Sequence, residues 1–420
     1  MRLIRSRAAL WTAFLLVHGW LTYLGVGPAR GRSFGDVDLY RRWALSGLHN
    51  GFWPGLDSAW VYPVGAWVPI LIPAVVSVTS KVAYALSWCI VVALLDALVV
   101  QALDRTGRAP SAPGPGASHV ALIADDPSMS GRIAAWGWVA FVAALGPVAI
   151  GRLDSIVAPM MVIALLAARR HPGVASALLT AGAWIKVAPG ALLIAVAAAA
   201  KRPVRDVVLP AAAVSAVVVG VTAAFGGMSF LAGFLGDQDV RGLQVEAVGA
   251  TPWVLAGMFS HQIHIIYNVR LVTFEITGPG TATVAGYLNA LLVLVVAGVS
   301  VLVVWARRRG VDVLLPGALA LAATLIVTNK VGSPQYMMWL APAIAVAVAT
   351  RAHGPWLRLG VLALGTAAAT QIIYPWSYGR LLRSEFFISS LLALRNIAVV
   401  VMLVVAINAV VQTIRERPTA

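Results

Sequence analysis

The sequence predicts an all-α polytopic membrane protein. Of its 420 residues, 60% are hydrophobic and only 11% are charged, with a mean hydropathy of +0.86. A soluble domain is about 45–50% apolar and about 25% charged, so this chain has too little charge to cover a surface that faces water. The apolar runs are long and lack the alternation of barrel strands, as in 284–305 and 388–411. Because lipid leaves backbone polar groups to be satisfied within the segment, we expect helices.

The apolar runs predict about 12 transmembrane helices. The first run, 8–26, comes after a group of arginines, as the apolar part of a signal peptide does. No small-residue cleavage site follows it, so we interpret it as a retained first span. Several later runs are short for a span of about 20 residues. Pro147, Pro159 and Pro189 suggest kinks or half-helices. The later runs are 67–80, 82–103, 133–150, 155–168, 174–185, 188–200, 207–225, 284–305, 313–328, 337–349, 357–373 and 387–411.

The charged residues predict the orientation of a single integral domain over residues 1–420. The formal charge of +15 comes from 31 basic and 16 acidic residues. The basic residues lie in short clusters between apolar runs, which the positive-inside rule explains and which argues against a nucleic-acid partner. The protein is then expected in the cell membrane, with its long loops 28–66, 226–283 and 374–385 on the extracytoplasmic side. The clusters predicted to be cytoplasmic are Arg2/Arg5/Arg7, Arg169/Arg170, Lys201/Arg202/Arg205, Arg307/Arg308/Arg309, Arg351/Arg358 and Arg415/Arg417.

The linker 104–132 is rich in Pro, Gly and Ser, and we interpret it as a flexible cytoplasmic loop. A cytoplasmic linker requires one net crossing over 67–103, although two apolar runs lie there. We therefore expect 67–80, which contains Pro69 and Pro73, to be a re-entrant or partial helix.

The first outer loop, 28–66, holds the candidate catalytic acid. It brings Asp36, Asp38, Tyr40 and Arg41 into a short stretch just beyond the first span. One interpretation is a solvated interfacial loop in which Tyr40 is a belt residue. The other is a carboxylate held near the membrane surface as a general base, with Arg41 binding a phosphate or positioning the acid.

Ionisable residues also interrupt the apolar runs. Asp154 follows a tight turn, Lys186 lies within an apolar stretch, and Asp96 lies inside run 82–103. Such residues are costly in a membrane and point to function by default, although Asp96 could also pair with another helix. Asp154 and Lys186 fall on the same predicted face as the first outer loop.

Three further segments are expected at that face. His261 and His264 would share a face if their segment were helical, but the nearby acids lack the spacing of a metal site. Cys89 is the only cysteine, which excludes an intrachain disulfide. We expect neither a metal nor a cofactor. The candidate binding residues in these segments are Arg241, Gln244, Glu246, Arg270, Lys330, Ser333, Gln335 and Tyr336.

Six short elements resemble, in order, the polyprenol-phosphate-mannose-dependent glycosyltransferases of the GT-C superfamily, most closely glycosyltransferase family 87. The six elements are spread over most of the length of the chain. The elements are an acid-to-tyrosine element at Asp36–Tyr40, part of a Tyr-Pro-Pro element at Tyr62–Val64, a Gly-Gln-x-Asp turn at Gly151–Asp154 with Arg152 in place of Gln, a Lys-x-x-Pro element at Lys186–Pro189, an Arg-Gly-x-Gln-x-Glu turn at Arg241–Glu246, and a Ser-Pro-Gln-Tyr element at Ser333–Tyr336 preceded by Lys330.

The resemblance implies a GT-C-like transferase without a nucleotide-sugar site. Its donor is a sugar on a polyprenyl phosphate, usually mannose, and its acceptor is a glycolipid or cell-wall glycan outside the membrane. By its spacing to Tyr40, Asp36 is the expected base. The leaving phosphate would be neutralised by some of Lys330, Lys186, Arg41 and Arg270. Some relatives carry a histidine in the Ser-Pro element, where this chain has none.

The stereochemistry expected from the resemblance is inversion. The spacing of Asp36 and Asp38 does not by itself exclude retention, which needs two carboxyl groups about 5 Å apart. In an extended segment the two acids would share a face at roughly 6–7 Å.

A transporter or flippase of a lipid-linked sugar is the main alternative. It would share the spans and the charges. It predicts a site at mid-bilayer and pseudo-repeats in the two halves, but the polar groups cluster at one predicted face and the sequence has no such repeat. A structural or polymerase-partner subunit would need no acid in the first loop. The chain lacks a GxxxxGK[ST] loop, which argues against a nucleotide-driven pump.

Overall fold

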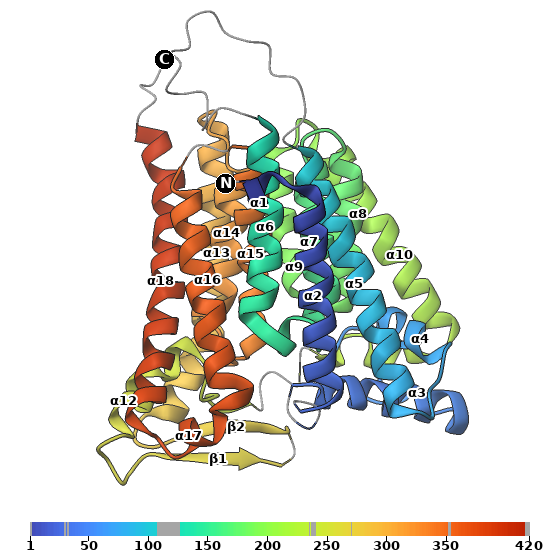
Figure 1. Ribbon diagram of the computed structural model, residues 1–420, viewed down its shortest axis with the longest axis vertical. Coiled ribbons are helices and arrows are strands. Elements are labelled where there is room, and N and C mark those ends of the chain that lie inside the picture. The colour runs from blue at the N-terminus through green and yellow to red at the C-terminus, as the bar shows by residue number, and fades with distance from the viewer. Residues whose placement is uncertain are drawn as a thin grey trace, which may run out of the picture.

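The computed structural model describes residues 2–28, 31, 33–106, 127–234, 236, 241–269, 271–351 and 354–415. Helices lie side by side in a bundle, with the N-terminus and the end of the last helix at one end, called here the terminal end (Figure 1). The helices are α1 (Arg2–Arg5), α2 (Arg7–Val26), α5 (Lys81–Thr106), α6 (Pro127–Leu145), α7 (Asp154–Ala167), α8 (Pro172–Ile185), α9 (Ala188–Ala199), α10 (Leu209–Ala224), α13 (Thr281–Arg308), α14 (Leu314–Val327), α15 (Ala341–Ala349), α16 (Trp356–Gln371) and α18 (Phe386–Arg415).

The opposite end of the bundle, called here the cap end, carries the three long segments predicted to share one side (Figure 1). They contain short helices and two strands rather than simple loops. Two of the cap elements are antiparallel strands, β1 and β2, in which His264 lies opposite Thr277. They are a small departure from the all-α prediction. A second small core that includes Leu243, Ile276 and Leu392 packs the cap onto α18. The cap elements are α3 (Gly35–Asn50), α4 (Trp67–Ala74), α12 (Thr251–Ala256), α17 (Tyr378–Leu382), β1 (His264–Asn268) and β2 (Thr273–Thr277).

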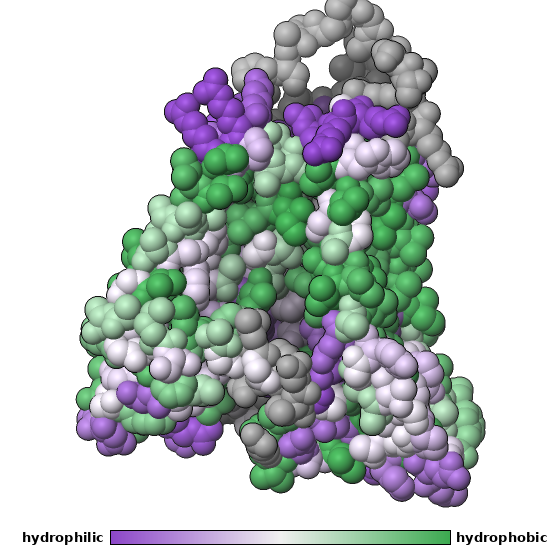
Figure 2. Space-filling model, turned by 180° about the vertical axis from the view of Figure 1, so that it is seen from behind, coloured by the Kyte–Doolittle hydropathy of each residue, from purple (hydrophilic) through white to green (hydrophobic). Residues whose placement is uncertain are grey.

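The surface has the pattern of a membrane protein. A hydrophobic band lies between hydrophilic residues at the two ends (Figure 2). In the described part of the chain, seven helices are long and apolar enough to cross a membrane. Shorter apolar helices, among them α7, α8, α9, α14 and α15, lie between them. The multi-pass helical fold is thus confirmed, whereas a total of about 12 spans stays a prediction.

The predicted helix breaks have different outcomes. α6 ends at Leu145, and a short 3₁₀ helix that contains Pro147 follows it. Pro189 lies in the first turn of α9, where its missing N–H costs nothing. Pro159 lies inside α7, which continues past it within the bundle, so a division into half-helices there was wrong, whereas a kink stays a prediction. α4 has 8 residues, too few to cross a bilayer, in agreement with a partial helix.

Helices extend into both ends of the predicted linker, 104–132. Asp104 lies in α5 and Arg132 in α6, and their buried side chains form an ion pair. Arg7 of α2 also bonds Asp104, at 3.1 Å. Buried charges need such partners, and the pairing explains why the two helices extend into the predicted linker. Residues 107–126 lie outside the described part of the chain.

Asp96 has a partner inside the bundle. The Nε2 atom of His18 lies 3.0 Å from one oxygen of Asp96, and the indole N–H of Trp138 donates to the other at 2.9 Å. The Nδ1 of His18 lies 3.0 Å from the carbonyl of Phe14. A carbonyl only accepts hydrogen bonds, so this Nδ1 carries a proton. We call these three side chains the His18 cluster; it joins α2, α5 and α6.

Candidate functional site

Asp36, the predicted base, lies in the first turn of α3. An acid is favoured there because the amino end of a helix carries partial positive charge. The carboxylate makes an ion pair with the guanidinium of Arg152, in the turn that precedes α7. The Asp36 side chain is 29% exposed and that of Arg152 only 9%. The acid thus remains partly accessible, while its partner is buried.

Asp38 and Arg41 make a separate contact. An extended segment would have placed Asp36 and Asp38 on one face, but both belong to helix α3, where residues two apart point in different directions. Asp38 accepts a hydrogen bond from Nε of Arg41 at 2.9 Å, and Arg41 also donates to the carbonyl of Val78 at 3.0 Å. This pair joins α3 to the segment before α5 and does not supply a second carboxylate beside Asp36.

Asp154 and Lys186 form a buried pair within electrostatic range of Arg152. Asp154 accepts from Nζ of Lys186 at 2.5 Å and from the indole N–H of Trp339 at 2.7 Å. The chain is extended at Lys186, between α8 and α9. Its ammonium lies 5.4 Å from the ring centre of Tyr336, a cation–π distance. The structure therefore brings three predicted residues together around one charge pair.

Aromatic side chains border this region. The hydroxyls of Tyr40 and Tyr62 are 3.5 Å apart. Trp43 and Trp60 pack edge-on against Tyr62, with ring centres at 6.1 and 5.7 Å. Burial raises the pKa of Tyr62 to about 12. The phenol therefore stays protonated at neutral pH and keeps a hydrogen to donate.

The polar turn before α12 lies against the segment that follows α14. The backbone N–H of Gln244 donates to the carbonyl of Lys330 at 3.0 Å. A Cβ on Gly332 would come within 2.1 Å of the backbone nitrogen of Ala247, so only glycine permits this approach. The predicted residues in these two segments are Arg241, Gln244, Glu246, Lys330, Ser333, Gln335 and Tyr336.

Glu246 is held from the bundle side by α18. One oxygen of its carboxylate accepts from Arg395 at 2.7 Å, and its backbone carbonyl accepts from the same guanidinium at 2.9 Å. Arg395 also bonds the side-chain oxygen of Asn396, at 2.9 Å. The carboxylate of Glu246 is thereby committed to positioning its turn.

Several buried polar atoms in this region have no hydrogen-bond partner among the described residues: Nε of Arg152, Nε of Arg241 and Oε1 of Gln335. Buried polar groups are normally bonded. The charges of Asp154 and Arg241 both act on Tyr62, so these groups surround one region. The unmatched donors and acceptor fit a polar ligand. We call the five charged residues of this region the cap cluster: Asp36, Arg152, Asp154, Lys186 and Arg241.

Sequence reasoning missed several residues of the site. Arg152 appears in the sequence only as a replacement within the Gly-Gln-x-Asp element, although an arginine in a tight turn between two apolar runs is itself a signal. Its second nitrogen donates to the hydroxyl of Tyr374 at 3.1 Å. Arg395 lies within an apolar run, where the cost of a charge predicts a partner. Trp339 gave no signal, because an indole in an apolar helix is ordinary.

The two histidines lie apart from the cap cluster. His264 begins strand β1 and His261 lies in the turn before it, so the segment is not a helix and the two side chains do not share a helix face. Both His261 and His264 are exposed. Within the described residues, no group of three or more His, Cys, Asp or Glu side chains could hold a metal ion. Arg270 lies outside the described residues.

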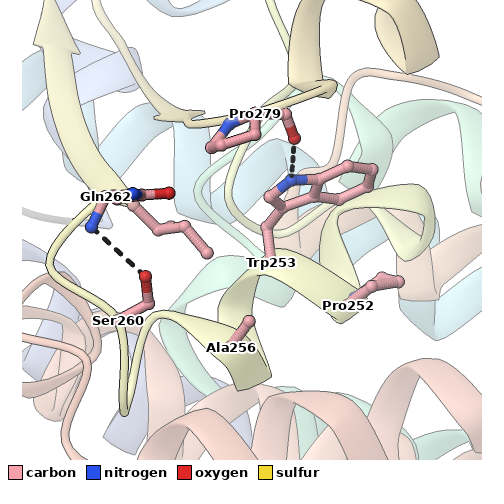
Figure 3. Close-up of a pocket in the computed structure, with 7 residues that line it drawn as sticks. Pro252, Trp253, Ala256, Ser260, Gln262 and Pro279 are labelled. Carbon is pink, nitrogen blue, oxygen red and sulfur yellow. Dashed lines mark hydrogen bonds between the residues drawn. The ribbon is translucent and has the colours of Figure 1, made fainter.

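A shallow pocket in the cap lies beside α12 (Figure 3). The indole N–H of Trp253 donates to the carbonyl of Pro279 at 2.8 Å, and the backbone of Gln262 bonds the hydroxyl of Ser260 at 3.2 Å. The lining is mainly apolar and includes none of the predicted site residues. The cap cluster is therefore the stronger candidate for chemistry.

The model of glycosyltransferase family 87 matches residues 60–334, about two thirds of the chain. The match includes Tyr62, Asp154 and Lys186, whereas Asp36 precedes it and Tyr336 follows it. No curated protein matches the sequence. The family match covers more than half of a chain whose helices suit a membrane, so the resemblance is confirmed. The chain belongs to glycosyltransferase family 87 and is a multi-pass membrane glycosyltransferase.

Proposed function

We propose that this enzyme transfers mannose from a polyprenyl-phosphate donor to a hydroxyl of a glycolipid or cell-wall glycan. The reaction takes place at the cap end, on the extracytoplasmic side of the cell membrane, and inverts the anomeric carbon. The observation that carries the proposal is the cap cluster itself. It sets a partly exposed carboxylate beside the buried Arg152, and Arg152 and Arg241 each have a buried Nε–H without a partner among the described residues.

The position of the cluster suits an amphipathic donor. The hydrophobic band of the bundle offers a surface for a lipid tail, and the cap end offers charge for a phosphate (Figure 2). Three cations of the cluster, Arg152, Lys186 and Arg241, face two carboxylates, Asp36 and Asp154. An anionic group would restore the balance. The aromatic residues around Tyr62 border the same region and suit the sugar.

The chemistry is a single displacement. Asp36 accepts the proton of the acceptor hydroxyl as that oxygen attacks the anomeric carbon. The bond between that carbon and the phosphate oxygen breaks, and the lipid phosphate leaves with the electron pair. Lys186, Arg241 and Lys330 stabilise its charge. The only other acid of the cap cluster, Asp154, is already bonded to Lys186 and Trp339, which favours inversion over a second nucleophile.

The remaining predicted binding residues take supporting roles. Gln244, Ser333, Gln335 and Tyr336 border the region that we assign to the sugar and acceptor. Asp38, Tyr40 and Arg41 hold α3 in place, and Glu246 holds its turn.

The test uses purified protein in nanodiscs with radiolabelled polyprenyl-phosphate mannose and a membrane glycolipid extract. Wild type should form a labelled glycolipid, and Asp36→Asn should be slower by about 100- to 10,000-fold, because a general base contributes that much. Asp57→Asn is the matched control: Asp57 is an exposed acid of the same outer segment that bonds the N–H of Trp53.

A folded Asp36→Asn protein that transfers mannose at the wild-type rate would overturn the role of Asp36. Transfer from a different polyprenyl-phosphate sugar, but not from mannose, would correct the donor. Movement of the intact lipid-linked sugar across liposomes without transfer would identify a flippase instead.

A further inference from the structure

Arg152 stands where the family resemblance has glutamine, and it is the partner of the proposed base. We propose that Arg152 exchanges partners during the reaction. In the ligand-free enzyme it neutralises Asp36, and when the donor binds it takes the donor phosphate and releases Asp36 to act as the base. This inference rests on the proposed function and adds a binding residue and an order of events to it.

The guanidinium of Arg152 is built for a further anionic contact. One terminal nitrogen pairs with Asp36, and the other donates to Tyr374 at 3.1 Å. Its Nε–H is buried and has no partner within the described part of the chain. Arginine presents its N–H groups in a planar fork that matches phosphate oxygens. The unmatched Nε–H therefore gives a phosphate its first contact, and a second contact through the fork would compete with Asp36 for a terminal nitrogen.

The charges of the cap cluster fit one phosphate. Asp154 matches Lys186 and Asp36 matches Arg152, which leaves the charge of Arg241 over. Nε of Arg241 is also buried without a partner among the described residues. A phosphodiester brings a single negative charge and several acceptor oxygens. It would offer acceptors to the unmatched Nε–H of Arg152 and reduce the net positive charge of the cap cluster.

The exposures of the two partners favour the exchange in this direction. Arg152 is buried and needs an anion beside it at all times. Asp36 is 29% exposed, so after release it can bond water or the acceptor hydroxyl. A carboxylate held by a guanidinium is a weaker base than a free one. The exchange therefore frees the base only when a donor is present, which disfavours activation of a hydroxyl without a donor.

The first measurement is the dissociation constant for polyprenyl phosphate, in nanodiscs, without acceptor. Arg152→Gln, which installs the residue of the family element, should weaken binding by about 10- to 100-fold, because a charged hydrogen bond is lost. Arg152→Lys keeps the charge without the fork and should lie between. Arg383→Gln, an exposed arginine of the cap that pairs with Glu385, should bind as wild type. Polyprenol, which lacks phosphate, should bind all four proteins alike.

The second measurement separates exchange from a simple charge effect. Asp36→Asn removes the competitor of the phosphate and should tighten polyprenyl-phosphate binding in the wild-type background. In the Arg152→Gln background the same change should have no effect, because there is no guanidinium to compete for. A double-mutant cycle isolates this coupling. Equal tightening in both backgrounds would mean a general charge effect and would overturn the exchange.

The outcomes distinguish this inference from the proposed function. If wild type binds polyprenyl phosphate and both Arg152 variants bind it equally well, the exchange is wrong and the transferase proposal stands. If wild type binds inorganic phosphate as tightly as polyprenyl phosphate, the site recognises free phosphate and a lipid-phosphate donor is wrong. If wild type binds neither, both proposals fail.

Discussion

Two polar clusters of this protein are built differently. In the His18 cluster, within the bundle, both oxygens of Asp96 and both ring nitrogens of His18 have partners. In the cap cluster, nitrogens of Arg152 and Arg241 are buried without a partner among the described residues. Buried polar groups are normally satisfied by the fold. A complete network therefore needs no further explanation, whereas an incomplete one indicates a ligand.

The contrast changes how an intramembrane acid is interpreted. Asp96 and Asp154 both interrupt apolar sequence, and both are buried. Asp96 is bonded to neighbouring helices and holds them together. Both oxygens of Asp154 also have partners, but one partner, Lys186, lies within electrostatic range of Arg152 at the cap end. The position of a charge relative to unmatched neighbours, rather than its burial, separates the two roles.

The largest effect is expected from Lys186→Met, which should impair both stability and transfer. It leaves the carboxylate of Asp154 buried without its cation, which costs about 3–5 kcal/mol of unfolding free energy. Chemical denaturation in detergent measures the loss. A second change, Asp154→Asn, should recover most of the stability but not the transfer rate.

Lys201→Met is the control for that experiment, since Lys201 is exposed after α9. If Lys186→Met were as stable as wild type, the buried pair would not be coupled, and the contrast between the clusters would lose its basis.

Asp96→Leu should affect stability alone. It leaves Nε2 of His18 and the indole N–H of Trp138 without their hydrogen-bond partner, at about 1–3 kcal/mol for each group. The rate of transfer per folded molecule should stay at the wild-type value, measured on the monodisperse fraction. Asp312→Leu, at an exposed acid, should change neither quantity. A strong loss of transfer by folded Asp96→Leu would place the His18 cluster in the catalytic machinery.

The smallest effect concerns Tyr62 and alkaline pH. Its pKa is raised from 10.0 to about 12 by burial, so the folded state holds the phenolic proton more tightly than the unfolded state. This contribution to stability is complete below 10.0 and is lost as the pH rises through about 12. Wild type should therefore lose more stability over this range than Tyr62→Phe.

Thermal unfolding at a series of pH values measures that difference. Tyr23→Phe, at an exposed tyrosine of α2, should behave as wild type. Identical alkaline profiles for wild type and Tyr62→Phe would show that Tyr62 is open to water rather than buried in the site.

Much of the site could be predicted from the sequence because its residues lie in short polar elements between apolar runs. Asp154 meets Lys186, Tyr40 meets Tyr62, and Gln244 meets Lys330, as residues expected at one face should. The pairing of Asp38 with Arg41 and the strand at His264 were not expected. Both depend on whether a polar segment outside the bilayer forms a helix or a strand, and an apolar pattern decides this only inside the bilayer.

The sequence by itself determined that the chain is a helical membrane protein. Its excess of apolar residues leaves the bilayer as solvent, and a bilayer permits few backbone structures. Only the tertiary structure decided which charges meet. Asp36 pairs with Arg152, and Glu246 with Arg395 across 149 positions of sequence. A buried charge requires a partner, but the sequence does not say which one, because that choice depends on how helices distant in the chain pack together.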